Sequence, residues 1–302
     1  MITTEIEEHD LNRYTKKMTY DIFIIIIIIL IGSWVFYRDK TNYHRAPRTI
    51  WTYWEDPDRI PHTVTMCMEG WKKWNPTYKI IMLTKKNYKG YVTIPEDFLT
   101  HSNVTDCPER FSDVLRLWVL TEHGGLWLDP SVLLKGSVEE WLFPRYAEYS
   151  GFYMEQQSRP TPMIETWCMA CNKGSSFMKK WRDEFSQIGQ FVNIEAYLLS
   201  RKDMGVSFHT LNNPNGRAIQ VALQKILQID KYPLESLYLQ KSEEGPYRYL
   251  VDATWNSEKA VEAACRIKKY QSPIMNLRKE EREVLEKHLD FDFTLESCGW
   301  LD

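Results

Sequence analysis

An uninterrupted apolar run near the amino terminus constrains the fold of this chain most strongly. The run from Ile22 to Tyr37 reads IFIIIIIILIGSWVFY, sixteen residues without a charge, and it would span ~24 Å as a helix. Tyr20 before the run and Trp34 within it are aromatic residues of the kind found at membrane interfaces. Bulky residues follow the run where a signal-peptide cleavage site needs small ones. The sequence therefore predicts one uncleaved transmembrane helix over residues 20–37, and a buried helix of a soluble protein is the weaker alternative.

The predicted anchor divides the chain into four parts. Residues 1–19 form an amino-terminal tail, residues 38–48 a polar linker, and residues 49–302 one large domain. Basic residues occur on both sides of the anchor, so the charge rule does not orient it. We therefore expect a single-pass membrane protein whose large domain is either lumenal, as in a type II protein, or cytoplasmic.

Composition limits the class of partner. The net charge of -3 and the absence of a basic stretch argue against nucleic acid. Aromatic residues make up 14% of the chain, which suits a large core and also stacking platforms for bases or sugars.

Cys168 and Cys171 form a lone CxxC without a second ligand pair, so we interpret them as residues of a buried strand rather than a zinc site. Asn103 begins a formal glycosylation sequon, which matters only in a lumenal domain.

The start of the large domain alternates strand and helix patterns. Residues 49–54, TIWTYW, predict a strand, and apolar residues at helical spacing predict a helix over residues 62–74. Residues 78–83, YKIIML, predict a second strand after an Asn-Pro break. A strand, a helix and a strand in about thirty-five residues are typical of a parallel crossover unit, so the domain opens as an α/β fold.

The segment SDVLRLWVLTEHGGLWLDPSV, Ser112 to Val132, carries the chemistry. Ser112 is a predicted N-cap, and Gly124 and Gly125 predict the end of the helix. The strand that follows leads to Asp129 at its carboxyl end, where α/β sheets bind ligands. Asp113 and Arg116 are three residues apart and neighbours on the helix surface. One interpretation is a surface ion pair with Asp129 in a turn, and the other is a site for a metal-bound diphosphate.

This segment resembles the SD…R…GG.W.D signature of glycosyltransferases with the GT-A fold, above all the branch of capsular polysaccharide synthesis proteins and DXD sugar transferases. The segments IWTYWEDPDRIPHTVTMCMEGWKKWNPTYKIIML and IETWCMACNKGSSFMKKW resemble the same branch. The resemblance extends over residues 49–188 and more loosely beyond. It implies a Rossmann-like GT-A domain that takes a nucleotide-sugar donor and a glycan or glycoprotein acceptor. A UDP-sugar is the favoured donor.

The resemblance also implies roles for particular residues. Thr52, Tyr53 and Trp54 would flank the base and ribose of the donor. Asp113 and Arg116 would lie by the donor sugar and its phosphates and would act in catalysis.

Asp129 would hold the metal, for which its hard oxygen ligand favours Mg²⁺ or Mn²⁺. Breaking the sugar–diphosphate bond leaves negative charge on the diphosphate, which a divalent cation and a fixed guanidinium would both stabilise.

One departure from the DXD pattern concerns the metal. Where the fuller motif reads Asp-x-Asp, the chain has Asp129, Pro130 and Ser131, so a hydroxyl replaces the second carboxylate. Ser131 is then a neutral ligand of the metal and donor, and the capsular branch resembled here tolerates a hydroxyl there. His209 in the segment VSFHTLNNPNG is a candidate distant ligand, although a single histidine is more often structural.

Transfer with inversion needs a general base that removes the acceptor proton. Glu155 and Glu165 both follow the metal strand, and Glu165 stands just before the predicted strand TWCMAC, which favours it as the catalytic base. Transfer with retention needs no such base, and the sequence does not choose between the two.

Three functions remain open at this stage. The first is a membrane-anchored, metal-dependent glycosyltransferase. The second is a nucleotide-sugar or glycan-binding protein that has lost catalysis together with the second carboxylate. The third is an anchored metal-dependent phosphoesterase, which the lack of a cluster of carboxylates disfavours.

Overall fold

The computed structural model of the chain describes residues 22, 24–28, 46–140, 142, 147–266 and 272–287. The chain divides into two units, Met1–His44 and Arg45–Asp302. In the first unit, residues 22 and 24–28 are helical, and most of the predicted anchor over residues 20–37 lies outside the described residues. Within the described ranges, no helix combines the length and apolarity needed to cross a membrane. The transmembrane anchor therefore stays a prediction.

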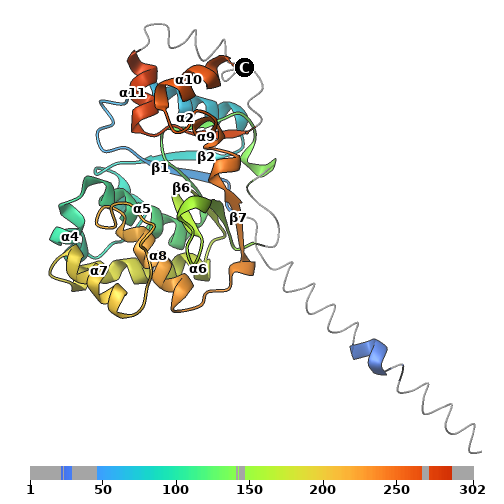
Figure 1. The fold of residues 1–302 in the computed structure, drawn as a ribbon, viewed down its shortest axis with the longest axis vertical. Helices are drawn as coiled ribbons and strands as arrows, with labels where there is room; N and C mark the ends of the chain where they lie inside the picture. Colours follow the sequence, from blue (N-terminus) through green and yellow to red (C-terminus); the bar gives the residue numbers. More distant parts are fainter. Residues whose placement is uncertain are drawn as a thin grey trace, which may run out of the picture. The chain divides into compact units, whose positions relative to one another are not determined.

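The second unit is built on a mixed sheet with strand order β2-β1-β3-β6-β5-β7 (Figure 1). Its strands are β1 (Thr49–Tyr53), β2 (Lys79–Leu83), β3 (Gly125–Leu128), β5 (Tyr149–Met154), β6 (Met163–Cys171) and β7 (Leu237–Lys241). A separate pair joins β4 (Val132–Leu134) to β8 (Ile274–Asn276). The predicted α/β fold is confirmed, and so are the strands predicted over residues 49–54 and 78–83.

Strand direction brings most strand ends to one edge of the sheet. β1 is parallel to β2 and β3, β6 is antiparallel to β3 and β5, and β5 is parallel to β7. The carboxyl ends of β1, β2, β3, β5 and β7 therefore meet the amino end of β6. We call this the carboxyl edge. We divide it into a β1–β3 side, formed by β1, β2 and β3, and a β5–β7 side, formed by β5, β6 and β7.

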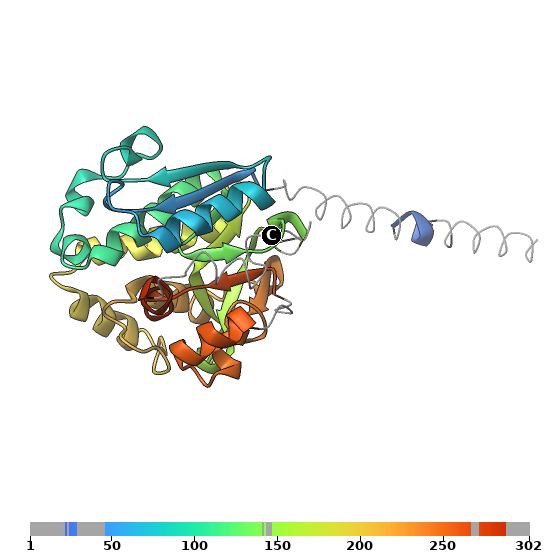
Figure 2. The same cartoon turned by 90° about the horizontal axis from the view of Figure 1, so that it is seen from above.

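Helices cover both faces of the sheet (Figure 1). One face is covered by α5 (Pro108–His123), α6 (Ser176–Phe185), α7 (Ile194–Asp203) and α8 (Ala218–Gln228). The other face is covered by α2 (His62–Trp74), α9 (Arg248–Asp252), α10 (Ser257–Arg266) and α11 (Lys279–Lys287), of which the last three lie together in orange to red (Figure 2). The predicted helix over residues 62–74 is confirmed.

Short helices fill the connections. Two are α-helical, α3 (Glu96–Leu99) and α4 (Ser102–Thr105). The others are 3₁₀ helices: η1 (Tyr88–Gly90), η2 (Val138–Glu140), η3 (Glu155–Gln157), η4 (Ser186–Gln190), η5 (Leu234–Ser236) and η6 (Ser242–Glu244). Both η3 and η6 follow strands of the β5–β7 side, so they shape that part of the carboxyl edge.

Helix α5 begins earlier and ends where predicted. Its N-cap is Cys107 and proline occupies its first turn, so the prediction of Ser112 as the N-cap is wrong. Proline suits that position because its fixed φ fits the helix and its missing N–H is not needed there. Gly124 and Gly125 have φ values of 67° and 99°, which favour glycine. A Cβ on Gly125 would lie 2.7 Å from the Thr49 carbonyl oxygen, so this turn also permits close packing against β1.

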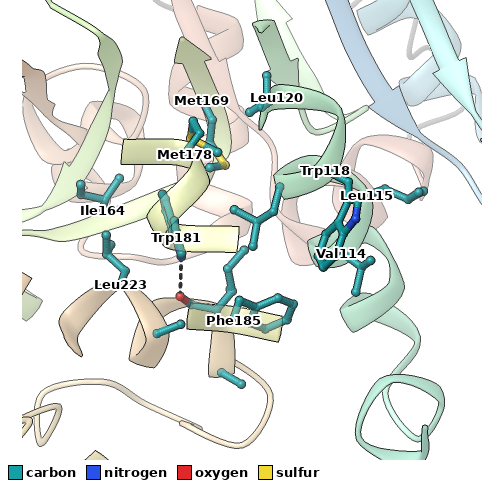
Figure 3. Close-up of a cluster of buried hydrophobic side chains, with 14 of the residues drawn as sticks. Val114, Leu115, Trp118, Leu120, Ile164, Met169, Met178, Trp181, Phe185 and Leu223 are labelled. Carbon is teal, nitrogen blue, oxygen red and sulfur yellow. Dashed lines mark hydrogen bonds between the residues drawn. The ribbon is translucent and has the colours of Figure 1, made fainter. Parts of the chain in front are cut away.

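The larger core cluster lies between the sheet and helices α5, α6 and α8. Figure 3 shows Trp181 and Phe185 of α6 between α5 and α8, with Met178 of the same helix beside Met169 of β6. Trp181 is fully buried, and its indole N–H donates to the Ile219 carbonyl at 2.8 Å. The apolar stripe of α6 therefore belongs to the core. Replacing such a tryptophan by alanine typically costs ~3–5 kcal/mol.

Helix α8 also buries a row of glutamines. Gln224 is fully buried, and its amide donates to the Pro162 carbonyl at 2.9 Å and accepts from Thr161 at 2.6 Å. One turn later, the amide of Gln228 donates to Gln224 at 2.7 Å and to the Ser207 carbonyl at 2.6 Å. These uncharged bonds join α8 to the segment before β6 and to the loop after α7.

Two features of the sequence prove structural. Cys168 and Cys171 are buried, unbridged residues of β6, as predicted. Asn103 of the sequon is 4% exposed, and its side-chain amide donates to the carbonyls of Ile188 and Phe191, both at 2.8 Å. The amide that would carry a glycan is therefore used inside the fold, where it ties α4 to η4.

Candidate active site

Arg116 is the centre of a charged cluster on the β1–β3 side. The guanidinium of this α5 residue lies 3.3 Å from Asp113 Oδ1 and 3.4 Å from Asp129 Oδ1. Its Nη1 donates to the Thr166 carbonyl of β6 at 2.6 Å, and its Nη2 donates to Ser112 Oγ at 3.1 Å. Arg116 is 5% exposed, so its ion pair with Asp113 exists but is buried rather than at the surface. The residue joins α5, the tip of β3 and the start of β6.

Asp129 is positioned at the carboxyl end of β3 by its neighbours. Its backbone N–H donates to the Trp167 carbonyl at 2.8 Å, and its Oδ1 accepts from the Trp127 indole at 2.9 Å. The Arg116 guanidinium also lies over the Trp127 ring at 5.1 Å, which favours the same geometry. Both side-chain contacts use Oδ1 and a third of the side chain is exposed, so Oδ2 is available to a ligand.

Asp113 is more deeply buried than Asp129. It is 7% exposed, and burial raises the pKa of its carboxyl to about 7, against the lowering effect of Arg116 and together with the raising effect of Asp129. The structure thus brings Asp113, Arg116 and Asp129 together as expected, but it buries Asp113. This carboxyl can hold Arg116 in place, and it changes charge near neutral pH.

Glu165 lies on the β5–β7 side, close to Asp129. It is inside β6 rather than before it, because β6 begins at Met163, and its side chain is half-buried. Burial raises its pKa to about 7; Arg217 lowers that pKa, and the charges of Glu243 and Asp129 raise it further. A carboxyl with this pKa is suited to accept a proton at neutral pH. The other predicted candidate, Glu155, is exposed and pairs with Lys241 at 3.0 Å.

Ser131 and His209 have different surroundings. Ser131 is 7% exposed, and its carbonyl accepts from the Leu277 N–H at 3.2 Å. His209 is exposed, and its Nδ1 is hydrogen-bonded to Ser207 Oγ at 2.8 Å. In the part of the chain that the structure describes, no three His, Cys, Asp or Glu side chains come together as a metal site would require.

Of the three residues predicted to flank the base, Thr52 and Tyr53 end strand β1 and Trp54 follows it. Thr52 is fully buried, so its side chain supports the strand instead of lining an open site. Tyr53 is half-buried and packs edge-on against Phe111 at 5.5 Å. Trp54 donates its indole N–H to the Arg59 carbonyl at 3.1 Å. Tyr53 and Trp54 are the two members of this set that border the carboxyl edge.

A pocket of about 450 Å³ opens beside Tyr53, beyond Phe111. Its lining combines aromatic and apolar residues with charged ones: Glu55, Lys85, Tyr88, Lys89, Glu96, Leu99, Thr100, Val104, Thr105, Cys107 and Phe111. Phe111 meets Tyr88 edge-on at 5.4 Å, and two exposed ion pairs, Lys85–Glu55 and Lys89–Glu96, lie along the lining. This pocket was not predicted from the sequence, although Phe111 stands two residues before Asp113.

The β5–β7 side contributes further charged residues that were not predicted from the sequence. Arg217, just before α8, is exposed, and its Nη1 is 3.5 Å from Gln157 Oε1 of η3. Glu243 of η6 accepts the Gln156 N–H with Oε1 at 3.1 Å. Both charges act on Glu165. The signal was the acidic run after LYLQK, which becomes informative once β7 is known to end at the carboxyl edge.

A charged cluster at the carboxyl edge of a mixed sheet, with an aspartate at the tip of a buried strand, defines a ligand-binding α/β protein. Residues 32–199, more than half of the 302-residue chain, match the model of the family described as capsular polysaccharide synthesis protein. The chain belongs to the capsular polysaccharide synthesis protein family, which confirms the family predicted from the sequence resemblance.

Individual relatives are more distant. The O-glycosyltransferase braB of Annulohypoxylon truncatum is 23% identical over 177 residues, which cover 52% of this chain and 41% of that protein. The chain therefore spans less than half the length of this curated relative.

Among solved structures, the PaToxG glycosyltransferase is similar at 17% identity and a TM-score of 0.40, over 69% of this chain and 87% of that one. The apo form of the glycosyltransferase GlyE of Streptococcus pneumoniae TIGR4 is similar at 14% identity and a TM-score of 0.40, over 83% and 62%.

Proposed function

We propose that the chain is a membrane-anchored, metal-dependent glycosyltransferase of the GT-A type. It would transfer a sugar from a nucleotide-sugar donor to a glycan or glycoprotein acceptor. A UDP-sugar is the favoured donor. The family and the O-glycosyltransferase relative support the class of reaction. The observation that carries the proposal is Asp129, a carboxylate fixed by Arg116 and Trp127 at a strand tip with one oxygen left for a ligand.

The donor nucleotide fits the β1–β3 side. Tyr88 and Phe111 offer aromatic surface to a base, and the lysines of the pocket lining add positive charge for phosphates. The register that pairs Trp51 with Trp127 brings the end of β1 level with the tip of β3. A base in the pocket and a diphosphate beside Asp129 would therefore lie along one continuous edge, past Tyr53.

Mn²⁺ or Mg²⁺ would fit this site as an ion coordinated by oxygens of both the protein and the diphosphate. Asp129 Oδ2 is the available carboxylate oxygen, and Ser131 supplies a nearby hydroxyl in the same turn. Hard divalent cations take such oxygen ligands and accept substrate phosphates and water in the remaining positions. The ion would supply positive charge to the departing diphosphate. His209 would have to bind through Nε2, because its Nδ1 is bonded to Ser207 Oγ.

The protein's own groups support the remaining chemistry. Arg116 holds Asp129 in place and adds fixed positive charge next to the leaving group, in a site that needs no rearrangement during the reaction. If transfer inverts the anomeric carbon, Glu165 accepts the proton of the acceptor hydroxyl, for which a pKa of about 7 is well matched. If transfer retains the configuration, Glu165 serves to orient the acceptor instead.

Membrane attachment rests on the apolar run. The helix predicted over residues 20–37 would hold the domain at a membrane, where lipid-linked or glycoprotein acceptors are concentrated. Basic residues on both sides leave a lumenal and a cytoplasmic domain as the two arrangements to be tested.

A second function is favoured by one specific observation. The chain has Ser131 where a fuller motif has its second carboxylate, and the described residues hold no cluster of three His, Cys, Asp or Glu side chains. A nucleotide-sugar-binding protein without transfer activity would need no more than this. It would bind the donor but would not consume it.

The experiment that separates the two functions uses the full chain purified in detergent. Its melting temperature is measured with UDP-, GDP- and CMP-sugars, with and without Mn²⁺, and donor consumption is followed in the same samples. A transferase is expected to be stabilised by one donor class and to release the nucleotide when an acceptor is added. Donor binding without release would indicate the binding protein, and no binding of any donor would contradict both functions.

A further inference from the structure

The pocket beside Tyr53 contains an ion pair at the ends of two neighbouring strands. Glu55 lies two residues after β1, and Lys85 lies two residues after β2. The strands are parallel and pair Tyr53 with Leu83, so their carboxyl ends bring Glu55 and Lys85 together. Lys85 Nζ contacts Glu55 Oε1, and both residues line the pocket. The pair therefore belongs to the β1–β3 side of the carboxyl edge.

This pair is accessible to a ligand. The side chains of Lys85 and Glu55 are 59% and 57% exposed. Ion pairs with this exposure contribute little to stability, so a ligand can approach either group at small cost. Burial, and then the negative charge of Glu55, raise the pKa of the Tyr53 hydroxyl. Glu55 therefore lies near Tyr53, the residue past which a bound nucleotide would extend toward Asp129.

The pair presents a hydrogen-bond acceptor beside a hydrogen-bond donor. The contact with Lys85 uses one oxygen of the Glu55 carboxylate, which has a second, and an ammonium group carries three N–H donors. Uracil and guanine have the complementary pattern, a carbonyl oxygen next to a ring N–H. Cytosine and adenine have the opposite pattern, an amino group next to a ring nitrogen without hydrogen. The pair can therefore distinguish the two classes of base.

We infer that Glu55 and Lys85 select the base of the donor nucleotide: Glu55 accepts the ring N–H of uracil or guanine, and Lys85 donates to the adjacent carbonyl oxygen. The inference rests on the proposed function for the nucleotide itself, and it adds the class of base and the residues that select it. Tyr88 and Phe111 meet edge-on at 5.4 Å and offer aromatic surface to the base in the same pocket.

Mismatched bases would lose affinity in this site. In the same pose, cytosine or adenine would direct its amino group at the Lys85 ammonium and a ring nitrogen without hydrogen at the Glu55 carboxylate. Two donors would then face each other, and so would two acceptors. A site that hydrogen-bonds one pattern rejects the other because the polar groups on both sides lose their partners.

A second ion pair of the lining supplies the matched control. Lys89 Nζ lies 3.6 Å from Glu96 Oε2, and their side chains are 69% and 70% exposed. These residues belong to η1 and α3 rather than to the strand ends. Glu55→Met and Glu96→Met each remove one negative charge from the pocket lining, and on charge alone each would strengthen the binding of every nucleoside diphosphate. Only Glu55→Met also removes the acceptor for the base.

Binding of UDP, GDP, CDP and ADP to the full chain in detergent is measured by calorimetry with Mn²⁺ present. We expect the wild type to bind UDP and GDP about tenfold more tightly than CDP and ADP. Glu55→Met should weaken UDP and GDP about tenfold, opposite to its charge effect, and should leave CDP binding in place, which shows that the pocket is folded. Lys85→Met should narrow the same preference, and Glu96→Met should retain it. The tighter of UDP and GDP identifies the base.

Three results would overturn the inference. They are equal affinities for the four nucleotides or a preference for CDP or ADP, an unchanged base preference in Glu55→Met, and the same loss of UDP binding in Glu96→Met as in Glu55→Met.

Nucleotide release from UDP-, GDP-, ADP- and CMP-sugars is recorded in parallel. Base-selective binding that depends on Glu55 without any nucleotide release would contradict the proposed transferase and leave the inference standing. Release without preference for uracil or guanine would contradict the inference and leave the transferase standing. Failure to bind any of the four nucleotides would contradict both.

Discussion

The two sides of the carboxyl edge hold their charges in different ways. On the β1–β3 side, Arg116 is buried and is bonded to Asp113, Asp129 and a carbonyl of β6. On the β5–β7 side, Arg217 is exposed, and the ion pairs of Lys241 involve exposed partners. A buried network is insulated from salt and costly to break, whereas exposed pairs contribute little. One side is thus built to keep a fixed geometry, and the other leaves its polar groups ready for a ligand.

This difference suits the two substrates of the proposed reaction. A nucleotide diphosphate is chemically constant, so a rigid site with one fixed carboxylate can serve it. Acceptors vary, and variation is easier where the polar groups lie on short 3₁₀ helices after strands, such as η3 and η6. Substitutions on the two sides should therefore affect different quantities.

The largest expected effect is on catalysis by Asp129→Asn. The amide keeps the shape but removes the charge at the tip of β3, so we expect transfer to fall about 10³-fold or more while the melting temperature changes little. Asp56→Asn, an exposed residue paired with Arg59, is the matched control. Full activity in Asp129→Asn would place the metal and diphosphate elsewhere.

Arg116→Met should have the largest effect on stability. It leaves Asp113 buried without its cation, and breaking a buried pair in this way costs about 3–5 kcal/mol. The free energy of unfolding in urea measures the loss, and Asp113→Asn in the same chain should recover part of it. Equal stability of Arg116→Met and Arg217→Met would remove the contrast between the two sides.

Glu165→Gln should change how stability depends on pH. Because the folded pKa of Glu165 is raised to about 7, the folded state holds its proton more tightly than the unfolded state. The stabilisation is complete below about pH 4 and is lost as the pH rises through about 7. Relative to the wild type, Glu165→Gln should therefore gain about 1–2 kcal/mol between pH 5 and pH 8. Parallel curves for the two proteins would mean that Glu165 is ionised throughout.

The smallest effect is expected from Lys241→Met on the β5–β7 side. The side chain loses two ion pairs with exposed partners, which water and salt already weaken. We expect no measurable change in the midpoint of urea unfolding, with or without added salt. A clear loss of stability would show that the β5–β7 side is also held by its ion pairs.

The β1–β3 side was the more predictable from sequence, for a physical reason. Residues 49–83 form a strand, a helix and a strand in direct succession, and local periodicity determines such units. The glycines after α5 and Asp129 after β3 were predicted in the same way. The start of α5 was not, because proline in the first turn and the Cys107 cap outweighed the capping preference of Ser112.

The β5–β7 side could not be predicted to the same depth. Strand β7 pairs with β5, which lies more than eighty residues earlier, and such pairing leaves no local pattern in LYLQK. The place of Glu243 follows from that pairing, whereas Arg217 reaches the same side through its contact with Gln157 of η3. The burial of Asp113 was hidden for a related reason, since a helix face becomes buried only when a distant segment packs on it.

The glutamine row of α8 gives the β5–β7 side a set of packing contacts that do not depend on pH. Gln224 and Gln228 join α8 to Pro162, just before β6, and to the Ser207 loop through amides, which neither gain nor lose protons. A change in pH therefore does not alter the charge of these amides or remove their hydrogen bonds. The contacts between α8, which follows Arg217, and the segment before β6 are therefore independent of pH over the range in which Glu165 changes its charge.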